Sequence, residues 1–242
     1  MFKDVKCPES IDSPIQEAIL EIRYEGNYPA DALYGVLFEI FDKFPDRENH
    51  ALPLLQIPPQ LRSVDPSFKY QPYYRAFDNG FAFAIGPHTI VFSALQPYCG
   101  WSKWKEFFIP KLEKIEQLKI IRYVERIGFR TLDVFNGNIF DKINTKFIVN
   151  DNIITTSPTT FFTEFDQNGV RVLLNIGNAA FVNGQPTKNS LIDIDCINWF
   201  NCEADNFFLA FNDSLEKVHK ENLQVFFGLL NHNLLTSLNP VY

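Results

Sequence analysis

The sequence predicts an α+β fold in which antiparallel sheet packs on long helices, and three observations support this prediction. Several segments alternate apolar and polar residues with the period of two that is typical of a strand with one buried face. Two long segments instead carry apolar residues at helical spacing. The order strand, helix, several strands, helix then occurs twice along the 242 residues. This repetition predicts a pseudo-duplicated unit with halves at about 10–119 and 120–242.

The first half opens with the clearest strand, in which one set of apolar residues alternates with a mostly polar set. A helix follows that begins at Pro29 and Asp31 and stops at Pro45. The proline-rich passage after it allows short edge strands but no central strand. A meander closes the sheet part of this half, with turn-forming residues between its strands. The predicted strands are Pro14–Tyr24, Tyr73–Phe77, Gly80–Ile85 and Thr89–Ala94.

A helix is predicted from Trp101 to about Lys119, because its tryptophan, phenylalanine, leucine and isoleucine residues recur on one side. Pro110 lies inside it and removes one helical hydrogen bond, at a cost of ~3 kcal/mol. The apolar stripe stays in phase across Pro110, which favours a kink over a break. The lysines and glutamates that alternate along this helix are typical of a solvated face.

The second half is predicted to begin with a long strand, Ile120–Val134, and a short helix near Phe140–Ile148. Turns are predicted at Gln167-Asn168-Gly169 and Asn183-Gly184, and a long helix from Asp205 to Ser237. The remaining strands are Thr159–Phe165, Val170–Ile176 and Leu191–Ile197. The residues of the two halves do not visibly repeat, so the duplication rests on element order alone. Because no linker separates the halves, we expect a single compact unit, 1–242.

Composition excludes several classes of protein. The formal charge is −7, and no run of lysine or arginine forms the basic patch that nucleic-acid binding needs. No segment approaches the roughly 20 apolar residues of a membrane span. The beginning of the chain lacks the apolar run of a secretory signal, and the four cysteines form no C-x-x-C pair. These features predict a cytoplasmic protein of bacterial type, with reduced thiols and without a cofactor.

Four passages resemble an uncharacterised, sporadically distributed prokaryotic family of unknown function. They are Pro14-Ile15-Gln16-Glu17-Ala18-Ile19-Leu20-Glu21-Ile22-Arg23-Tyr24, Pro97-Tyr98-Cys99-Gly100-Trp101, Arg126-Ile127-Gly128-Phe129-Arg130, and Leu191-Ile192-Asp193-Ile194-Asp195 with His219 in the last helix. The sequence departs from the family at Asp133, where asparagine is usual, and at Val218, where leucine is usual. The resemblance implies no activity. It implies only loosely a context of defence or mobile genes.

Arg126 and Arg130 share one strand face, about 13 Å apart, with Gly128 between them. Because the arginine side chain presents a planar fork of donors, one interpretation is a site for an anion or an acidic peptide. The other interpretation, which we favour, is that both arginines pair with Glu17, Glu21 or similar carboxylates across the sheet.

Asp193 and Asp195 also share a strand face, about 7 Å apart. Two such carboxylates could hold a divalent cation or act as an acid–base pair. No other residues complete a metal loop, so structural roles are favoured and no metal site is predicted. His219 is interpreted as a hydrogen-bonded or surface histidine rather than a general base. Cys99, at a helix start, could have a thiol pKa lowered by the helix dipole.

The sequence contains no phosphate-binding loop, dinucleotide fingerprint or nucleophile elbow. The leading hypothesis is therefore a non-catalytic binding or interaction protein that associates with an unknown protein partner or with itself through its Phe-rich helices. The 25 phenylalanines leave a second hypothesis, a carrier of a small apolar ligand in an aromatic-lined cavity. The third hypothesis is an enzyme that uses Arg126, Arg130, Asp193 and Asp195. No catalytic residue is assigned; candidate binding residues are these four and His219.

Overall fold

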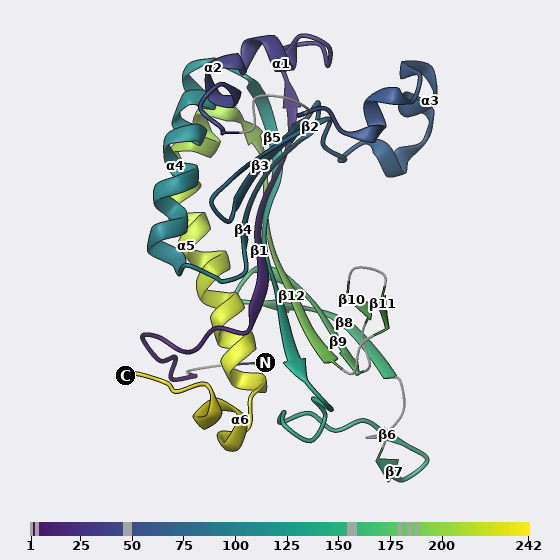
Figure 1. The fold of residues 1–242 in the computed structure, drawn as a ribbon, viewed down its shortest axis with the longest axis vertical. Coiled ribbons are helices and arrows are strands. Elements are labelled where there is room, and N and C mark those ends of the chain that lie inside the picture. Colours follow the sequence, from purple (N-terminus) through teal and green to yellow (C-terminus); the bar gives the residue numbers. More distant parts are fainter. Residues whose placement is uncertain are drawn as a thin grey trace. The chain divides into compact units, whose positions relative to one another are not determined.

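The computed structural model describes residues 2, 5–45, 50–153, 159–178, 181–182, 185–186 and 189–242. Within these residues it has mixed α+β structure, as predicted, and eight strands form one sheet in the order β2-β3-β4-β1-β5-β12-β9-β8 (Figure 1). The strands are β1 (Ile15–Gly26), β2 (Tyr74–Asp78), β3 (Phe81–Gly86), β4 (Thr89–Leu95), β5 (Ile121–Asn136), β8 (Thr159–Gln167), β9 (Val170–Asn178) and β12 (Asn189–Glu203). Two small hairpins, β6–β7 (Ile148–Val149 with Asn152–Ile153) and β10–β11 (Phe181–Val182 with Gln185–Pro186), stand outside this sheet.

The chain divides into two compact units that are interleaved in sequence. Unit 1 comprises Met1–Ala18, Phe129–Ile197 and Glu216–Tyr242, and unit 2 comprises Ile19–Gly128 and Asn198–Leu215. The boundaries fall inside β1, β5, β12 and the helix α5 (Ala204–Leu229), so these four elements contribute residues to both units. The single-unit organisation and the two halves at 10–119 and 120–242 stay predictions.

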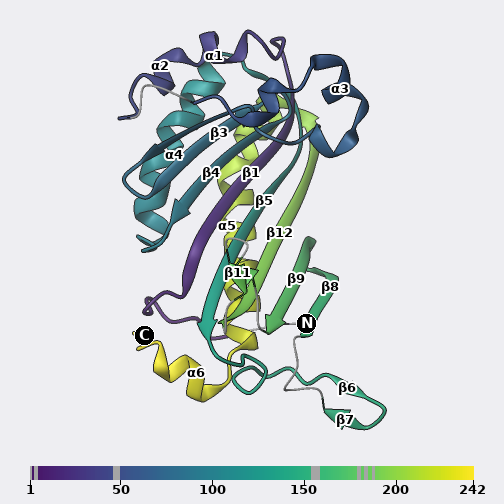
Figure 2. The same ribbon diagram turned by 45° about the vertical axis from the view of Figure 1, so that its right-hand side comes forward.

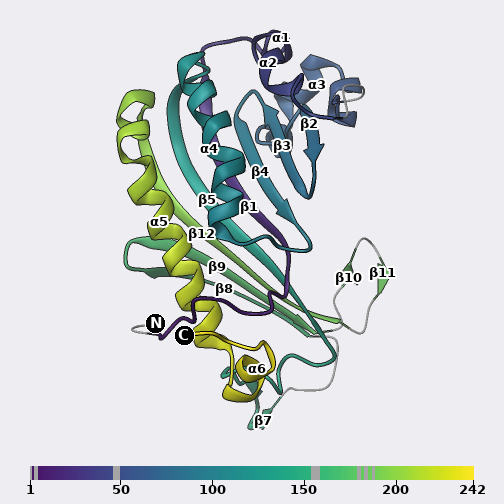
Figure 3. The ribbon, with the colours of Figure 1, turned by 60° about the vertical axis from the view of Figure 1, so that its left-hand side comes forward.

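In unit 2, β2, β3 and β4 form the predicted antiparallel meander within one residue of the expected bounds. Asn79 and Gly80 adopt positive φ angles of 44° and 85° in its first turn, as turn-forming residues do. The helix α4 (Trp101–Gln117) lies beside β3 and β4 (Figure 3). It buries the middle of its predicted stripe, Trp104, Phe108, Leu112 and Ile115. Pro110 lies inside α4 without ending it, so the prediction that Pro110 does not break the helix is confirmed.

The segment between β1 and β2 differs from the prediction. The expected helix ending at Pro45 is two single turns, α1 (Leu33–Val36) and α2 (Phe38–Phe41), because Leu37 leaves helical geometry at φ −95° and ψ 7°. The proline-rich passage forms short helical turns rather than edge strands. These are η1 (Pro53–Gln56), α3 (Pro59–Val64) and η2 (Pro66–Phe68), each with a proline at its start.

In unit 1, β8, β9 and the first part of β12 pair antiparallel (Figure 2). The turn predicted at Gln167-Asn168-Gly169 joins β8 to β9, with Asn168 and Gly169 at positive φ. The turn predicted at Asn183-Gly184 lies outside the described residues. The helix expected near Phe140–Ile148 is wrong: Ile139, Phe140 and Ile143 are buried there in an irregular segment. The last helix is divided into α5 and α6 (His232–Ser237), with Asn231 capping α6.

The phenylalanine excess is used largely in ring-to-ring packing. In unit 2, Phe41, Phe83 and Phe92 are buried and pack in succession, with ring centroids 5.4 and 5.3 Å apart. Trp104 and Phe108 continue the cluster from α4. In α5 the aromatic residues Phe207, Phe211, Phe226 and Phe227 are also buried. None of the helices in the described part of the chain combines the length and the apolar character that crossing a membrane requires.

Candidate functional site

The predicted arginine Arg126 is held by a carboxylate on the neighbouring strand. Its Nη2 donates to Oε2 of Glu21 at 2.6 Å, and its side chain is only 6% exposed. Glu21 Oε2 also accepts from Nε of Arg23 at 3.0 Å, so one carboxylate serves two guanidinium groups. These contacts within unit 2 confirm the interpretation that Arg126 pairs across the sheet.

Arg130 forms a fork-to-fork ion pair within unit 1. Its Nε and Nη2 donate to the two carboxylate oxygens of Asp193, both at 2.7 Å. Donating these hydrogen bonds to Asp193 raises the pKa of Arg130, and the charges of Asp193, Asp195 and Glu17 act in the same direction. This bidentate arrangement occupies both oxygens of Asp193 and one edge of the Arg130 guanidinium.

His219, the last predicted binding residue, lies on α5 with its ring edge-on to Phe129, at a centroid distance of 5.4 Å. Within the described residues, no three His, Cys, Asp or Glu side chains come close enough together to hold a metal ion. Arg126 belongs to unit 2, whereas Arg130, Asp193, Asp195 and His219 belong to unit 1. Arg126 is thus paired with Glu21 and Arg130 with Asp193.

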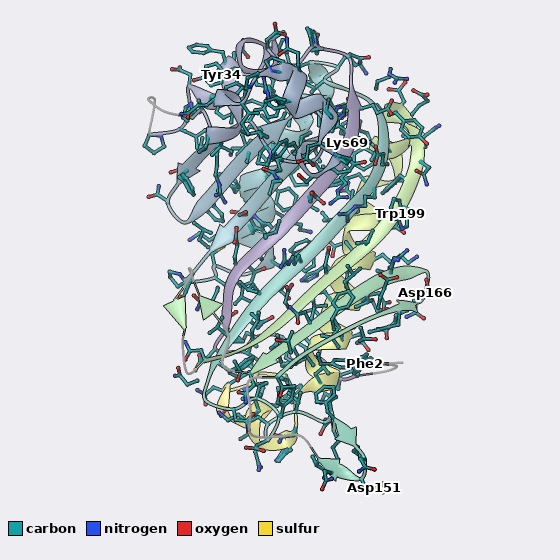
Figure 4. The ribbon with its side chains drawn as sticks, turned by 90° about the vertical axis from the view of Figure 1, so that its right-hand side faces the viewer. Phe2, Tyr34, Lys69, Asp151, Asp166 and Trp199 are labelled. Carbon is teal, nitrogen blue, oxygen red and sulfur yellow. The ribbon has the colours of Figure 1, made fainter. Side chains whose placement is uncertain are left out.

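A second polar cluster lies on the same face of unit 2, away from α4. The guanidinium carbon of Arg23 lies over the ring of Tyr70, 4.1 Å from the ring centroid. Lys69, the residue after η2, precedes Tyr70 in the chain. Lys69 and Tyr70 both bind the carboxylate of Glu125. Figure 4 shows Lys69 over the strands on the sheet face turned to the viewer. The segment Lys69–Tyr70 therefore covers part of this sheet face, and the charge of Lys69 is paired with that of Glu125.

Asp133 is a buried carboxyl group outside the set of predicted binding residues. It is 1% exposed, and among the described residues its Oδ2 has no hydrogen-bond partner. Burial raises the pKa of Asp133 to about 8. A hydrogen bond with Thr131 lowers this pKa, whereas the charge of Asp193 raises it. The Thr131 hydroxyl oxygen also lies 3.3 Å from Oδ1 of Asn222 on α5. The alternation of β5 contains the signal for this burial, because Asp133 shares parity with Phe129 and Phe135.

Lys111 is a second ionisable group outside the predicted binding residues. It lines a cavity of about 310 Å³ in unit 2. Lys111 is half-buried, and its Nζ donates to the carbonyl oxygen of Phe107 at 2.9 Å. The interpretation of this helix face as solvated is therefore wrong at Lys111. Burial lowers its pKa to about 8, and the charge of Lys43 acts in the same direction against that of Asp78. Cys99 also departs from expectation, because burial raises its thiol pKa.

The third feature is the outer edge of β8 in unit 1. One side of β8 pairs with β9 over all nine residues, from Thr159 opposite Asn178 to Gln167 opposite Val170. Among the described residues, no backbone hydrogen bond reaches Thr160–Gln167 from the other side. At the opposite edge of the sheet, in contrast, β2 receives Ala51 as a bridge partner of Tyr74.

The exposed side chains on β8 favour pairing of this edge with a further strand. Phe162 is 60% exposed on the strand. Glu164 is neutralised by an ion pair with Arg171 of β9. The strand contains no lysine, proline or glycine, which are among the residues that commonly protect natural edges from pairing.

Comparison with known proteins adds no identity to these features. No protein-family model matches the chain, and no curated protein matches it.

Proposed function

We propose that this protein is a non-catalytic interaction protein that pairs with a second copy of itself through the edge strand β8. The observation that carries the proposal is the outer edge of Thr160–Gln167, which has no backbone partner among the described residues. A strand edge of this length is a template for a further strand, because its N–H and C=O groups stand ready to hydrogen-bond. A second β8 supplies the same groups in antiparallel orientation and gives a closed, two-fold interface.

The side chains of β8 are compatible with this pairing. If Phe162 faces Phe162 of the second copy, each Glu164 faces a threonine, Thr160, of the other strand. No carboxylate then faces another, which would be destabilising, and the two exposed aromatic rings form a favourable cross-strand pair. The ion pair of Glu164 with Arg171 reduces the remaining negative charge at the edge.

Self-association is thus proposed through the sheet edge and not through the helices, where the sequence predicted it. Of the phenylalanines in the predicted stripe of α5, Phe211 and Phe226 are buried and Phe208 is half-buried. One large apolar side chain on α5, Leu209, is 87% exposed. Leu209 therefore offers a matched control for association through the helix.

The test is sedimentation velocity over a range of concentrations. We expect the wild-type chain to form a dimer, and Phe162→Lys to weaken self-association at least tenfold, since a lysine on an edge strand must be desolvated on pairing. Leu209→Lys, which adds the same charge to α5, should leave the dimer intact. Circular dichroism establishes that both variants are folded.

A wild-type chain that sediments as a monomer up to high concentration would contradict the proposal. Dissociation by Leu209→Lys but not by Phe162→Lys would also contradict it, and would return the interface to the helix.

A further inference from the structure

The cavity beside Lys111 is formed by one helix and the segment that packs on it, all within unit 2. Its walls come from α2 and the residues after it, from α4, and from Asp78 at the end of β2. Apolar and charged side chains share the lining: Ile40, Phe44 and Pro110 are apolar, and Glu39, Lys43, Asp78, Glu113 and Lys114 are charged. A volume of about 310 Å³ lies at the lower end of the range for small-molecule sites.

Two neighbours fix the amine of Lys111 in this cavity. Its Nζ donates to the carbonyl oxygen of Phe107 and lies 3.6 Å from the centroid of the Phe107 ring. The ring of Phe44 stands on another side, at 5.4 Å. The neighbouring Lys114 is held by Glu39 at 2.7 Å. The amine is thus oriented, half-removed from water and next to apolar surface.

We propose that Lys111 is a nucleophilic amine that forms an imine with small aldehydes carrying an apolar tail. The lone pair of Nζ adds to the carbonyl carbon, and the resulting carbinolamine loses the former carbonyl oxygen as water with two protons, leaving a C=N bond. This reaction needs the unprotonated amine. The apolar walls at Ile40 and Phe44 select the tail. With Lys111 unprotonated, the charged lining has three acidic and two basic residues, which disfavours an anionic aldehyde.

The lowered pKa of Lys111 supports the reactivity. At pH 8 about half of this amine is unprotonated, against less than about 1% of an ordinary lysine. The facing charges act in both directions: Lys43 lowers the pKa and Asp78 raises it. Asp78→Asn should therefore shift the reaction to lower pH.

The experiment is reductive trapping of the full chain with benzaldehyde and cyanoborohydride, read by peptide mass spectrometry. At pH 8 we expect Lys111 to be modified at least tenfold faster than Lys103, which lies exposed on the same helix. Its rate should level off above pH 8, whereas the rate at Lys103 should continue to rise to about pH 10. Lys111→Arg keeps the charge and should remove the fast phase.

Glyoxylate serves as the comparison aldehyde, since it is anionic and has no apolar tail, and it should react more slowly than benzaldehyde at Lys111. Equal rates at Lys111 and Lys103 in the wild-type chain would overturn the proposal, whether or not Lys111→Arg folds. Faster reaction with glyoxylate would overturn the assigned aldehyde class. The readout is independent of self-association through β8.

Discussion

Replacing Asp133 by asparagine should stabilise the protein increasingly as the pH rises from about 4 to about 8, and have little effect below that window. The carboxyl of Asp133 has an ordinary pKa of 3.8 and one of about 8 in the folded protein. Between these values the folded state retains a proton that the unfolded state has lost, so stability falls as pH rises through this window. Over about four pH units the loss is on the order of 5 kcal/mol. Asparagine cannot ionise, so the Asp133→Asn variant does not undergo this loss of stability.

The measurement is the difference in melting temperature between Asp133→Asn and wild type from pH 5 to pH 9. It should grow with pH and reach roughly 10 °C, since 1 kcal/mol corresponds to ~2–4 °C for a chain of this size. Asp213→Asn, an exposed change on α5, is the control and should give a flat difference. A flat profile for Asp133→Asn as well would mean that Asp133 is ionised throughout.

The second large effect is expected from Arg126→Ala. Removing this buried guanidinium leaves Glu21 mostly covered, with Arg23 as its remaining ion-pair partner in the sheet. Breaking a buried pair costs 3–5 kcal/mol, and the partial exposure of Glu21 reduces this to about 2–3 kcal/mol. Urea denaturation should show the loss as a lower midpoint with an unchanged slope.

Arg122→Ala provides a matched control on the same strand. Arg122 pairs with Glu25 at the surface, where both side chains are about half exposed, so its removal should cost less than ~1 kcal/mol. Adding Glu21→Gln to Arg126→Ala should recover part of the lost stability, because it removes the uncompensated charge. Equal losses from Arg126→Ala and Arg122→Ala would show that burial of the pair contributes nothing.

Local patterns in the sequence predicted most of the sheet. The alternation of Ala18, Leu20 and Ile22 places their side chains on the buried face, and all three are fully buried. Alternation reports the face of a strand but not its neighbours, because neighbours are set by contacts between distant segments. The pairing of Arg130 with Asp193, 63 residues away, therefore could not be read from either strand alone.

The failures lie where local signals are weak or conflict with packing. Leu37 lies inside an apolar stripe at helical spacing, yet its backbone leaves the helix and its side chain is buried. Lys111 looks solvated from its own helix. Part of its cover comes from Phe44, which lies in a segment that precedes α4 by more than fifty residues. A one-dimensional pattern does not contain such a contact.

The division into two units has a consequence for optical measurements. All three tryptophans of the sequence, Trp101, Trp104 and Trp199, belong to unit 2. Intrinsic tryptophan emission therefore reports the melting of unit 2 directly. It does not report directly on unit 1, which contains Asp133 and β8. A far-ultraviolet dichroism melt that precedes or follows the emission melt would reveal that the two units lose their structure in separate steps.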